Sequence, residues 1–349
     1  MTTSKGKKTT PEFISTFFAG QAKNITLFIL MIGLFILFST LSPSRFPTTR
    51  NFRNMLAQFP EFGLLTVAMM LSMVVGGIDL SVVAIANICG VFAAKILVAG
   101  NESALYSGGT LIFFVVVVVI VTAALCGLFN GTLIAVAGVP PILATLGTQG
   151  LLMGLAILLT KGYSVTGFPA EVDFIGNGSI FNIPVPFYLF VIMAFLVGFI
   201  LRRTRLGFNM YMIGANPQVS RYSGVNNTMV IIRTFMLTGI LAGISSLIML
   251  SRANSMRPGY GTDYLLQAIL VAVLGGTDPK GGVASLIGLV MGIMILQFTQ
   301  SGLTMLAFSA FTKKLLWGLA LLLIMVINFI ISKYNERKRI MVVQKESKE

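Results

Sequence analysis

The stretch VVGGIDLSVV, residues 74–83, places two glycines and an aspartate within one of the most apolar regions of the chain. A glycine can adopt the left-handed conformation that ends a helix, and an aspartate can cap the first amides of the helix that follows. The stretch is therefore predicted to be a hinge between two apolar helices. Gly76, Gly77 and Asp79 are the residues that would form it.

Asp79 itself has two interpretations. A carboxylate at the centre of a bilayer costs about 2.5–3.5 kcal/mol on insertion scales, so a deep position would indicate a site for a substrate or an ion. A position near the cytoplasmic interface would instead let Asp79 cap a helix, because free amides and the helix dipole stabilise its charge. We favour the cap.

A second, similar stretch is GGTDPKGG, residues 275–282. Here Gly275, Gly276 and Asp278 repeat the pattern, and Pro279 stands where a proline is tolerated at the first position of a helix. Doubled elements interrupted by glycine or proline are common in transporters. The two stretches are therefore predicted to be a weak internal repeat, with each hinge near the cytoplasmic end of its span.

Composition assigns the chain to the membrane. It has 349 residues, of which 56% are hydrophobic and 10% charged, and its mean hydropathy is +0.90. Soluble proteins carry about 25% charged residues. The chain has no histidine, and its two cysteines, Cys89 and Cys126, lie in apolar segments. This excludes histidine-based metal sites and proton relays and provides no disulfide framework, so no metal, cofactor or catalytic residue is predicted.

The expected fold class is an all-α polytopic membrane protein of about ten transmembrane helices, some of them broken or short. The predicted spans are 24–42, 55–76, 80–99, 110–137, 140–160, 184–203, 228–251, 262–275, 282–300 and 313–333. The eighth is too short to cross the membrane by itself.

Positive charge orients these spans. Lysines and arginines are concentrated in the segments that this count places in the cytoplasm, which predicts that both termini are cytoplasmic. Residues 1–23 and 334–349 are then cytoplasmic tails, and 24–333 form a single transmembrane domain. The net charge of +14 is mostly a consequence of topology, and no soluble basic domain is present to bind nucleic acid.

One cytoplasmic segment, 202–226, carries its own helix signals. Asn216 can cap a helix that starts at Pro217, and Gly224 can end it, which predicts about two turns over 217–223. Such a helix can insert into a groove on a partner. It can equally be a connecting helix held at the membrane interface by its arginines.

Four ordered motifs resemble the permease subunits of bacterial ribose-type ABC sugar importers. They are VVGGIDLSVVAIANICG (74–90), NGTLIAVAGVPPILATLGTQGLLMGLAILLTKG (130–162), GANPQVSRYSGVN (214–226) and AVLGGTDPKGGVASLIGLVMG (272–292). The resemblance covers about 55–330. Typical members follow GGIDLSV with glycine, whereas Val83 and Ala84 follow it here. Packing or path width at that point is therefore expected to differ.

The resemblance implies a multi-pass permease of the bacterial plasma (inner) membrane that imports a monosaccharide. Its expected partners are a second permease subunit (identical or paralogous), membrane lipid, an extracytoplasmic solute-binding protein and a cytoplasmic ATPase. ATP hydrolysis is expected on that separate subunit, since this chain has no G-x-x-x-x-G-K-[ST] phosphate loop. The resemblance also makes 207–226 the loop that couples the permease to the ATPase. The residues of this loop that match the motif are Gly214, Asn216, Pro217, Arg221 and Gly224.

Other functions remain open at this point. Related permeases carry nucleosides, a furanosyl signalling molecule or branched-chain amino acids. A secondary transporter driven by an ion gradient would require a titrating role for Asp79 at mid-membrane. A membrane enzyme is disfavoured because no acid–base or nucleophile cluster is present.

Polar side chains inside the spans are candidates for the translocation path. They are Asn87, Asn130, Thr145, Thr148, Gln149, Gln267, Gln297 and Gln300. Thr145, Thr148 and Gln149 share one helix face after Pro140 and Pro141 and make the best single patch. For each residue the competing interpretation is a hydrogen bond between helices, worth about 0.6–2 kcal/mol.

A further pattern concerns helix packing. Gly288 and Gly292 are spaced G-x-x-x-G, which predicts close packing either within the subunit or across a permease dimer.

Overall fold

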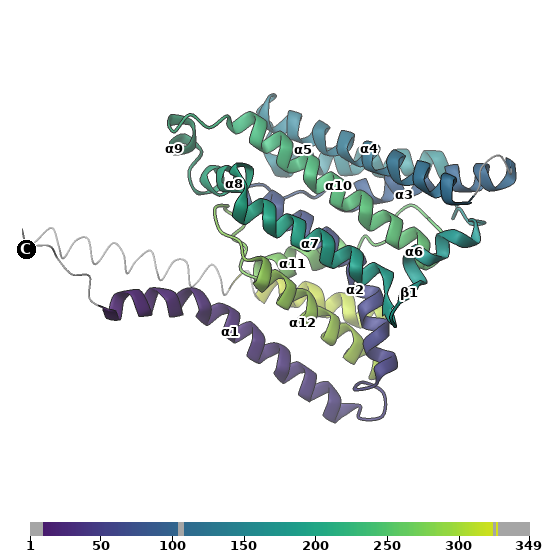
Figure 1. Cartoon of the computed structure of the whole chain (residues 1–349), viewed down its shortest axis with the longest axis horizontal. Coiled ribbons are helices and arrows are strands. Elements are labelled where there is room, and N and C mark those ends of the chain that lie inside the picture. The colour runs from purple at the N-terminus through teal and green to yellow at the C-terminus, as the bar shows by residue number, and fades with distance from the viewer. Residues whose placement is uncertain (1–9, 104–107, 324–325, 327–349) are drawn as a thin grey trace, which may run out of the picture.

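A computed structural model describes residues 10–103, 108–323 and 326, and within these the chain is almost entirely helical (Figure 1). This confirms the all-α, polytopic prediction. In chain order the elements are α1 (Thr10–Leu41), α2 (Thr49–Val74), α3 (Val82–Ser103), α4 (Gly108–Ala135), α5 (Pro141–Thr160), the 3-10 helix η1 (Ala170–Val172), α6 (Asp173–Asn177), the strands β1 (Ser179–Ile180) and β2 (Ile183–Pro184), α7 (Val185–Arg203), α8 (Arg205–Ala215), α9 (Pro217–Tyr222), α10 (Asn227–Ala253), α11 (Tyr264–Leu274) and α12 (Leu286–Met305).

Eight helices in the described part of the chain are long and apolar enough to cross a membrane. They correspond to eight of the ten predicted spans. The predicted span 262–275 is the shorter helix α11, and residues 310–323 are helical up to the point where the description ends. The rest of the predicted span 313–333 and the predicted tail 334–349 lie outside the described residues. At the other terminus, α1 already begins at Thr10, within the predicted tail 1–23.

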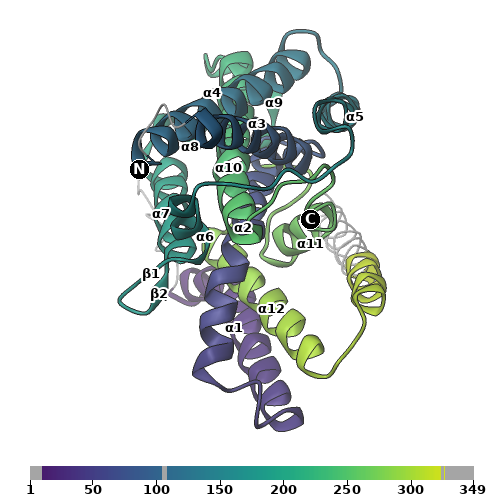
Figure 2. The ribbon, with the colours of Figure 1, turned by 90° about the vertical axis from the view of Figure 1, so that its right-hand side faces the viewer.

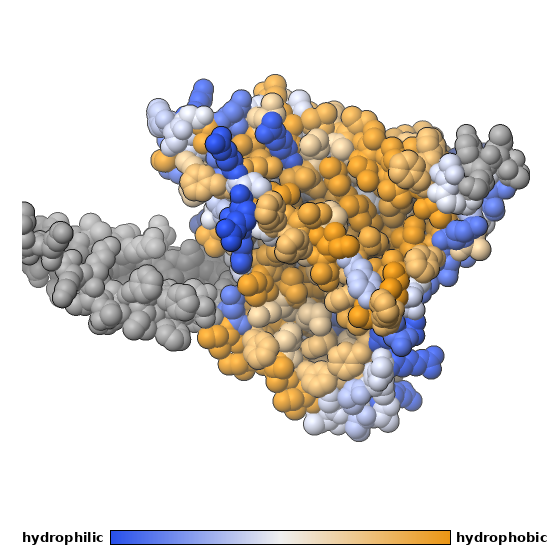
Figure 3. Space-filling view, in the orientation of Figure 1, coloured by the Kyte–Doolittle hydropathy of each residue, from blue (hydrophilic) through white to orange (hydrophobic). Residues whose placement is uncertain are grey.

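The long helices pack into one body with two polar ends. Figure 3 shows a broad apolar surface between a hydrophilic end at α8 and α9 and a second hydrophilic region near α6 and β1. The basic residues of α8, α9 and their flanks put the first end in the predicted cytoplasm. The antiparallel hairpin β1–β2 and α6 lie at the opposite end, the predicted extracytoplasmic side.

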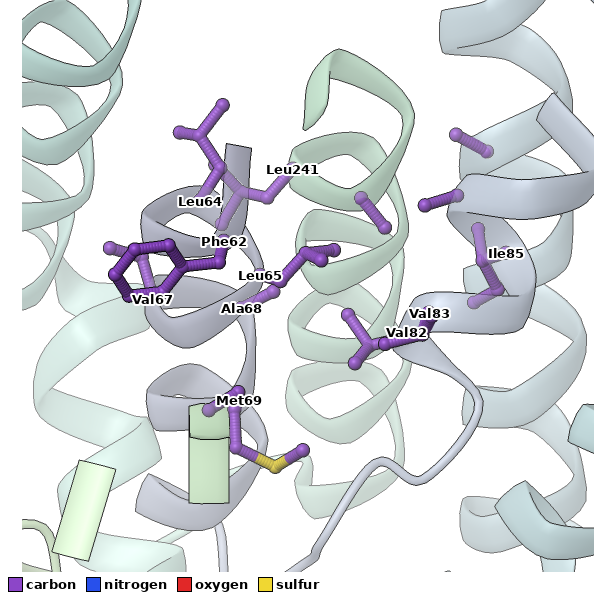
Figure 4. Packing of buried hydrophobic residues seen from close by; sticks show 14 of the residues in the cluster. Phe62, Leu64, Leu65, Val67, Ala68, Met69, Val82, Val83, Ile85 and Leu241 are labelled. Atoms are coloured by element: carbon purple, nitrogen blue, oxygen red, sulfur yellow. The ribbon is translucent and has the colours of Figure 1, made fainter. Parts of the chain in front are cut away.

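Two helices, α2 and α10, form the centre of the body. α10 packs against α4, α2 and α3, and almost every residue of α2 after Phe59 is buried. Figure 4 shows part of the buried cluster, in which Leu65 of α2 points toward α10 and Phe62 points to the opposite side of α2. α2 is the least apolar of the long helices and carries Glu61, Thr66 and Ser72, so it is better accommodated inside the protein than against lipid.

The cytoplasmic segment contains two helices rather than the single one predicted for 202–226. α8 is amphipathic, with Gly207, Met210 and Ile213 buried, and Thr204 caps it by accepting a hydrogen bond from the Gly207 N–H (3.3 Å). α9 is the predicted short helix.

The glycine pair of α12 packs within the subunit. A Cβ at Gly288 would overlap the carbonyl oxygen of Gly275, and one at Gly292 would lie 3.1 Å from Cγ1 of Val271 in α11. The predicted close packing of the G-x-x-x-G pair is therefore found within the subunit, against α11 and the residue that follows it. The close approach fixes α11 against α12.

Candidate functional site

The first hinge is a non-helical break of residues 75–81 between α2 and α3. Gly76 has a φ of +82°, and the N–H groups of Gly76 and Gly77 still bond to the last turn of α2. Thr145 of α5 closes the middle of the break. Its Oγ1 lies 3.1 Å from the carbonyl oxygen of Ile78 and 3.1 Å from the backbone nitrogen of Leu80.

Asp79 lies in this break, and its side chain is fully buried. Its Oδ1 accepts hydrogen bonds from the Ser81 backbone N–H (3.0 Å) and Oγ (2.6 Å), and its Oδ2 lies 3.1 Å from Oγ1 of Thr238 in α10. Asn130 of α4 donates in turn to Ser81 Oγ (2.7 Å). The carboxylate therefore joins α4, α10 and the start of α3. Neither ion pair in the described part of the chain involves it.

The second hinge, residues 275–285, differs from the first. Gly276, with a φ of +100°, ends α11, but no helix begins at Pro279. Asp278 caps a turn by accepting a hydrogen bond from the Lys280 N–H (2.9 Å), and α12 begins only at Leu286. The prediction that Pro279 starts a helix and that a span covers 282–300 from its first residue is thus wrong.

The physical reason lies in the glycines that follow Pro279. Gly281 and Gly282 have φ values of +99° and +77°, which a helix does not allow. The Gly282 N–H donates to the carbonyl oxygen of Val74 at the end of α2 (2.9 Å). The second hinge is therefore bonded directly to the first.

Gly214, near the end of α8, touches both hinges. A Cβ at Gly214 would overlap the carbonyl oxygen of Val74 and the backbone nitrogen of Gly282. A Cβ at Gly281 would lie 2.8 Å from Cα of Gly214 and 2.9 Å from Cα of Gly76. We call this meeting point of the two hinges and α8 the glycine junction. Its backbones approach so closely that no side chain fits between them.

Beyond the junction, α9 projects at the predicted cytoplasmic end (Figure 1). Asn216 caps it through Oδ1, which accepts hydrogen bonds from the backbone N–H groups of Gln218 (2.9 Å) and Val219 (3.1 Å). Asn227 holds it against α10 by donating to the carbonyl oxygen of Pro217 (2.9 Å).

The outer surface of α9 is open. The side chains of Val219 and Tyr222 are 54% and 92% exposed, and Arg221 and Gly224 are exposed as well. An anchored helix that presents an aromatic and an aliphatic side chain is a suitable docking element.

Three of the eight predicted path residues, Asn87, Thr145 and Thr148, bond to backbone groups. Asn87 of α3 donates to the carbonyl oxygen of Tyr260 (2.9 Å) and accepts from its N–H (3.1 Å). It thereby holds the non-helical residues 255–263 that precede α11. Thr148 donates to the carbonyl oxygen of Ala144 (2.9 Å) within its own helix.

The remaining path residues have fewer hydrogen-bond partners. Gln149 is half-buried on α5. Gln267 of α11 and Gln297 of α12 are buried, and each has one side-chain amide atom without a hydrogen-bond partner among the described residues. The structure therefore gathers Asn130, Thr145 and Asp79 at the first hinge and leaves the glutamines apart from it.

A buried cluster that the sequence reasoning missed lies in the predicted extracytoplasmic half. Glu61 of α2 is 2% exposed, pairs with Arg252 of α10 (2.9 Å between Oε2 and Nη1) and accepts a hydrogen bond from the Tyr264 hydroxyl of α11. The signal was present in the sequence, as an acidic residue beside Pro60 inside the predicted span 55–76.

This cluster joins three helices. The buried pair needs both members, since an uncompensated charge in a membrane interior is costly. No group of three or more Cys, Asp or Glu side chains among the described residues is arranged to hold a metal ion.

Comparison with known proteins extends these observations. The family described as the branched-chain amino acid transport system / permease component matches residues 51–326. The D-allose transport system permease protein of Escherichia coli K12 is 30% identical over 310 residues, 88% of this chain and 92% of that protein. The ribose import permease protein of the same strain is 32% identical over 304 residues, 86% of this chain and 92% of that protein.

A third relative has a different named cargo. An autoinducer 2 import system permease protein of Yersinia enterocolitica is 31% identical over 306 residues, 86% of this chain and 88% of that protein. No solved structure matches the chain.

The contacts of Asp79 lead to a prediction. Asp79→Ala removes the acceptor for the Ser81 N–H and the Ser81 and Thr238 hydroxyls, so it should lower stability by about 1–3 kcal/mol. Asp79→Asn keeps one acceptor oxygen and should retain assembly and transport. Thermal unfolding in detergent and uptake in proteoliposomes measure both. Equal and complete loss of uptake in the two variants, with normal assembly, would instead indicate that the negative charge itself is required.

Proposed function

Because this chain belongs to the branched-chain amino acid transport system / permease component family, we propose that it is the permease subunit of an ABC importer for a monosaccharide. The observation that carries the proposal is the similarity to the D-allose and ribose permeases across nearly the whole membrane domain. The cargo would be delivered by an extracytoplasmic solute-binding protein, and a separate cytoplasmic ATPase would drive transport. A second permease subunit, identical or paralogous, would complete the unit in the bacterial inner membrane.

A second candidate cargo has a specific observation in its favour. The similarity to the autoinducer 2 permeases is as high as that to the sugar permeases, so a furanosyl signalling molecule is the nearest alternative. An ion-coupled mechanism is disfavoured because both carboxylate oxygens of Asp79 already have hydrogen-bond partners.

We further propose that α9 docks on the ATPase and that α8 transmits its movement. Asn216 links the two helices, since it ends α8 and caps α9. A displacement of α9 therefore acts on α8 and on Gly214, which lies against both hinges. Both hinges would then move together, because the Gly282–Val74 hydrogen bond ties them to each other.

The path proposed for the cargo has few free polar groups. Asn87, Asn130 and Thr145 bond to backbone or to the hinge network. Gln149 and Gln267 remain available to cargo hydroxyls. The path is therefore proposed to bind its cargo weakly and to leave recognition to the solute-binding protein.

The docking role of α9 predicts that Val219→Ser with Tyr222→Ala weakens ATPase binding by about 2 kcal/mol or more, as expected when an exposed aromatic anchor is lost. Permease stability should not change, because both side chains are exposed. Co-purification of the ATPase and ATP-driven uptake are the measurements. Tyr163→Ala is the matched control, since Tyr163 is 75% exposed on the opposite side. Unchanged ATPase binding in the double variant would contradict the docking role.

The glycine junction predicts a different defect for Gly214→Ala. The added methyl overlaps Val74 and Gly282 and should cost about 1–3 kcal/mol through overpacking. The ATPase should still co-purify, because α9 is unaltered, whereas ATP-driven uptake should fall. Gly150→Ala is the control, because a Cβ at Gly150 meets nothing within 4 Å. Full uptake by Gly214→Ala would exclude the junction as a transmission point.

The cargo assignment is tested with the reconstituted complex. Permease, ATPase and the solute-binding protein encoded alongside are placed in proteoliposomes with labelled solutes. ATP-dependent uptake of ribose or allose, without uptake of leucine, is expected. Uptake of autoinducer 2 alone would favour the alternative, and the ligand that raises the melting temperature of the binding protein should be the one transported.

A further inference from the structure

A pocket of about 690 Å³ lies between the last turns of α3 and α5, at the predicted extracytoplasmic side. α3 contributes Lys95, Val98 and Ala99, α5 contributes Leu159 and Thr160, and the segment after α5 contributes Lys161, Ser164, Val165 and Thr166. The polar members are two lysines and three hydroxyl residues. We call this site the lysine pocket.

Among the described residues that line it, the pocket carries only positive charge. Lys95 and Lys161 are both exposed, and neither takes part in the two ion pairs of the described chain, which join Arg252 to Glu61 and Lys314 to Asp263. None of the described lining residues is acidic. The Thr160 hydroxyl already donates to the carbonyl oxygen of Ala156 (2.9 Å). The available donors are the two ammonium groups and the hydroxyls of Ser164 and Thr166, a set suited to an anionic oxygen group.

The local backbone holds this donor set in place. Lys161 is in the left-handed conformation with a φ of +54° and donates its N–H to the carbonyl oxygen of Ile157, which ends α5 at that residue. Val165 and Met256 exchange two backbone hydrogen bonds of 2.8 and 2.9 Å. The pocket wall is therefore fixed at both ends rather than being a loose loop.

The depth of the pocket corresponds to the headgroup level of a membrane. Lys161 directly follows the last residue of α5, whereas Lys95 lies two turns before the end of α3. A lysine at that point would be costly in hydrocarbon, and it can extend its ammonium toward the interface. Both lysines line one pocket, although Lys95 lies within α3 and Lys161 follows α5.

An apolar stripe continues from the pocket toward the membrane interior. Leu151, Leu155 and Leu159 recur every four residues and so share one face of α5, and Leu159 lines the pocket. Leu151 and Leu155 are 58% and 36% exposed. Figure 2 shows α5 at the edge of the helix bundle, where such a face is accessible from outside the chain.

We propose that the lysine pocket binds the phosphate of an anionic phospholipid, with an acyl chain lying along the leucine stripe. The lysines supply the attraction for the phosphate, the hydroxyls add hydrogen bonds, and the leucines contact hydrocarbon. Charge-assisted hydrogen bonds from ammonium groups to phosphate oxygens are the strong kind, whichever leaflet supplies the headgroup. A soluble anion would use the lysines but would make no use of the stripe, which is why the lipid is the better occupant.

The test uses the purified full chain in neutral detergent and follows its melting temperature as phosphatidylglycerol or phosphatidylcholine is added. Phosphatidylglycerol should raise the melting temperature more than phosphatidylcholine does. In Lys95→Gln with Lys161→Gln the apparent affinity for phosphatidylglycerol should fall by about tenfold or more, since each lysine near the headgroups contributes to the attraction. Lys95→Arg with Lys161→Arg should keep it.

The matched control is Arg45→Gln with Arg50→Gln, which removes two exposed positive charges from the same side outside the pocket. An equal loss in this control would show a general surface effect and would overturn the proposal. An equal response to inorganic phosphate or glycerol 1-phosphate would replace the lipid with a soluble anion.

A second measurement covers the remaining outcomes. Native mass spectrometry of the unaltered chain from mixed micelles should retain phosphatidylglycerol in preference to phosphatidylcholine, and the lysine double variant should lose that preference. Retention without preference would overturn the proposal. So would a lysine variant that keeps its lipid response but no longer associates with the solute-binding protein, because the pocket would then be a docking surface.

Discussion

Backbone groups inside a membrane have no water to bond to, and each interruption of a helix must therefore be satisfied by the protein itself. The chain interrupts its helices at the two hinges and again at 255–263. Thr145 and Asp79 satisfy the first hinge, and Asn87 holds the backbone of Tyr260 in the third interruption. These buried polar side chains therefore serve as hydrogen-bond partners for interrupted backbone. The positions of the spans around the hinges depend on it.

The breaks have a mechanical consequence because they meet. Gly282 bonds to the end of α2, and Gly214 of α8 lies against both segments without room for a side chain. Flexible side chains at such a contact would absorb a displacement, whereas backbones in direct contact transmit it. Glycine is therefore needed at this point as much for the close approach of the backbones as for its own backbone conformation. The same contact explains why the second hinge stays non-helical for eleven residues, 275–285, since Gly281 and Gly282 must reach α8.

Sequence predicted the spans and the short helix α9 because their signals are local: apolar length in one case, and the Asn216–Pro217 pair in the other. Asp278 shows the limit of that reasoning. Its local pattern matches that of Asp79, but contacts with distant residues decide which conformation follows, and these give a turn. The same limit applies to Asn87, whose partner Tyr260 is far away in the sequence.

Two features were not predicted from the sequence: a short helix, and a buried charge whose partners lie on other helices. α8 was missed because an amphipathic helix of 11 residues is too short for a span search, although Thr204 and the spacing of its buried residues mark it. Glu61 was overlooked as a single acid in an apolar span, because its meaning comes only from Arg252 and Tyr264 on other helices. A buried charge in a span should therefore prompt a search for its partner before a function is assigned.

Some polar side chains hold the backbone and others are free to contact cargo, and this bears on how related permeases can differ in cargo. Permeases named for allose, ribose and autoinducer 2 share 30–32% identity with this chain over almost their full lengths. On the proposed path, Asn130 and Thr145 support the first hinge and Asn87 holds Tyr260, so these side chains are not free for cargo-specific contacts. This is consistent with the proposal that recognition of the cargo rests with the solute-binding protein.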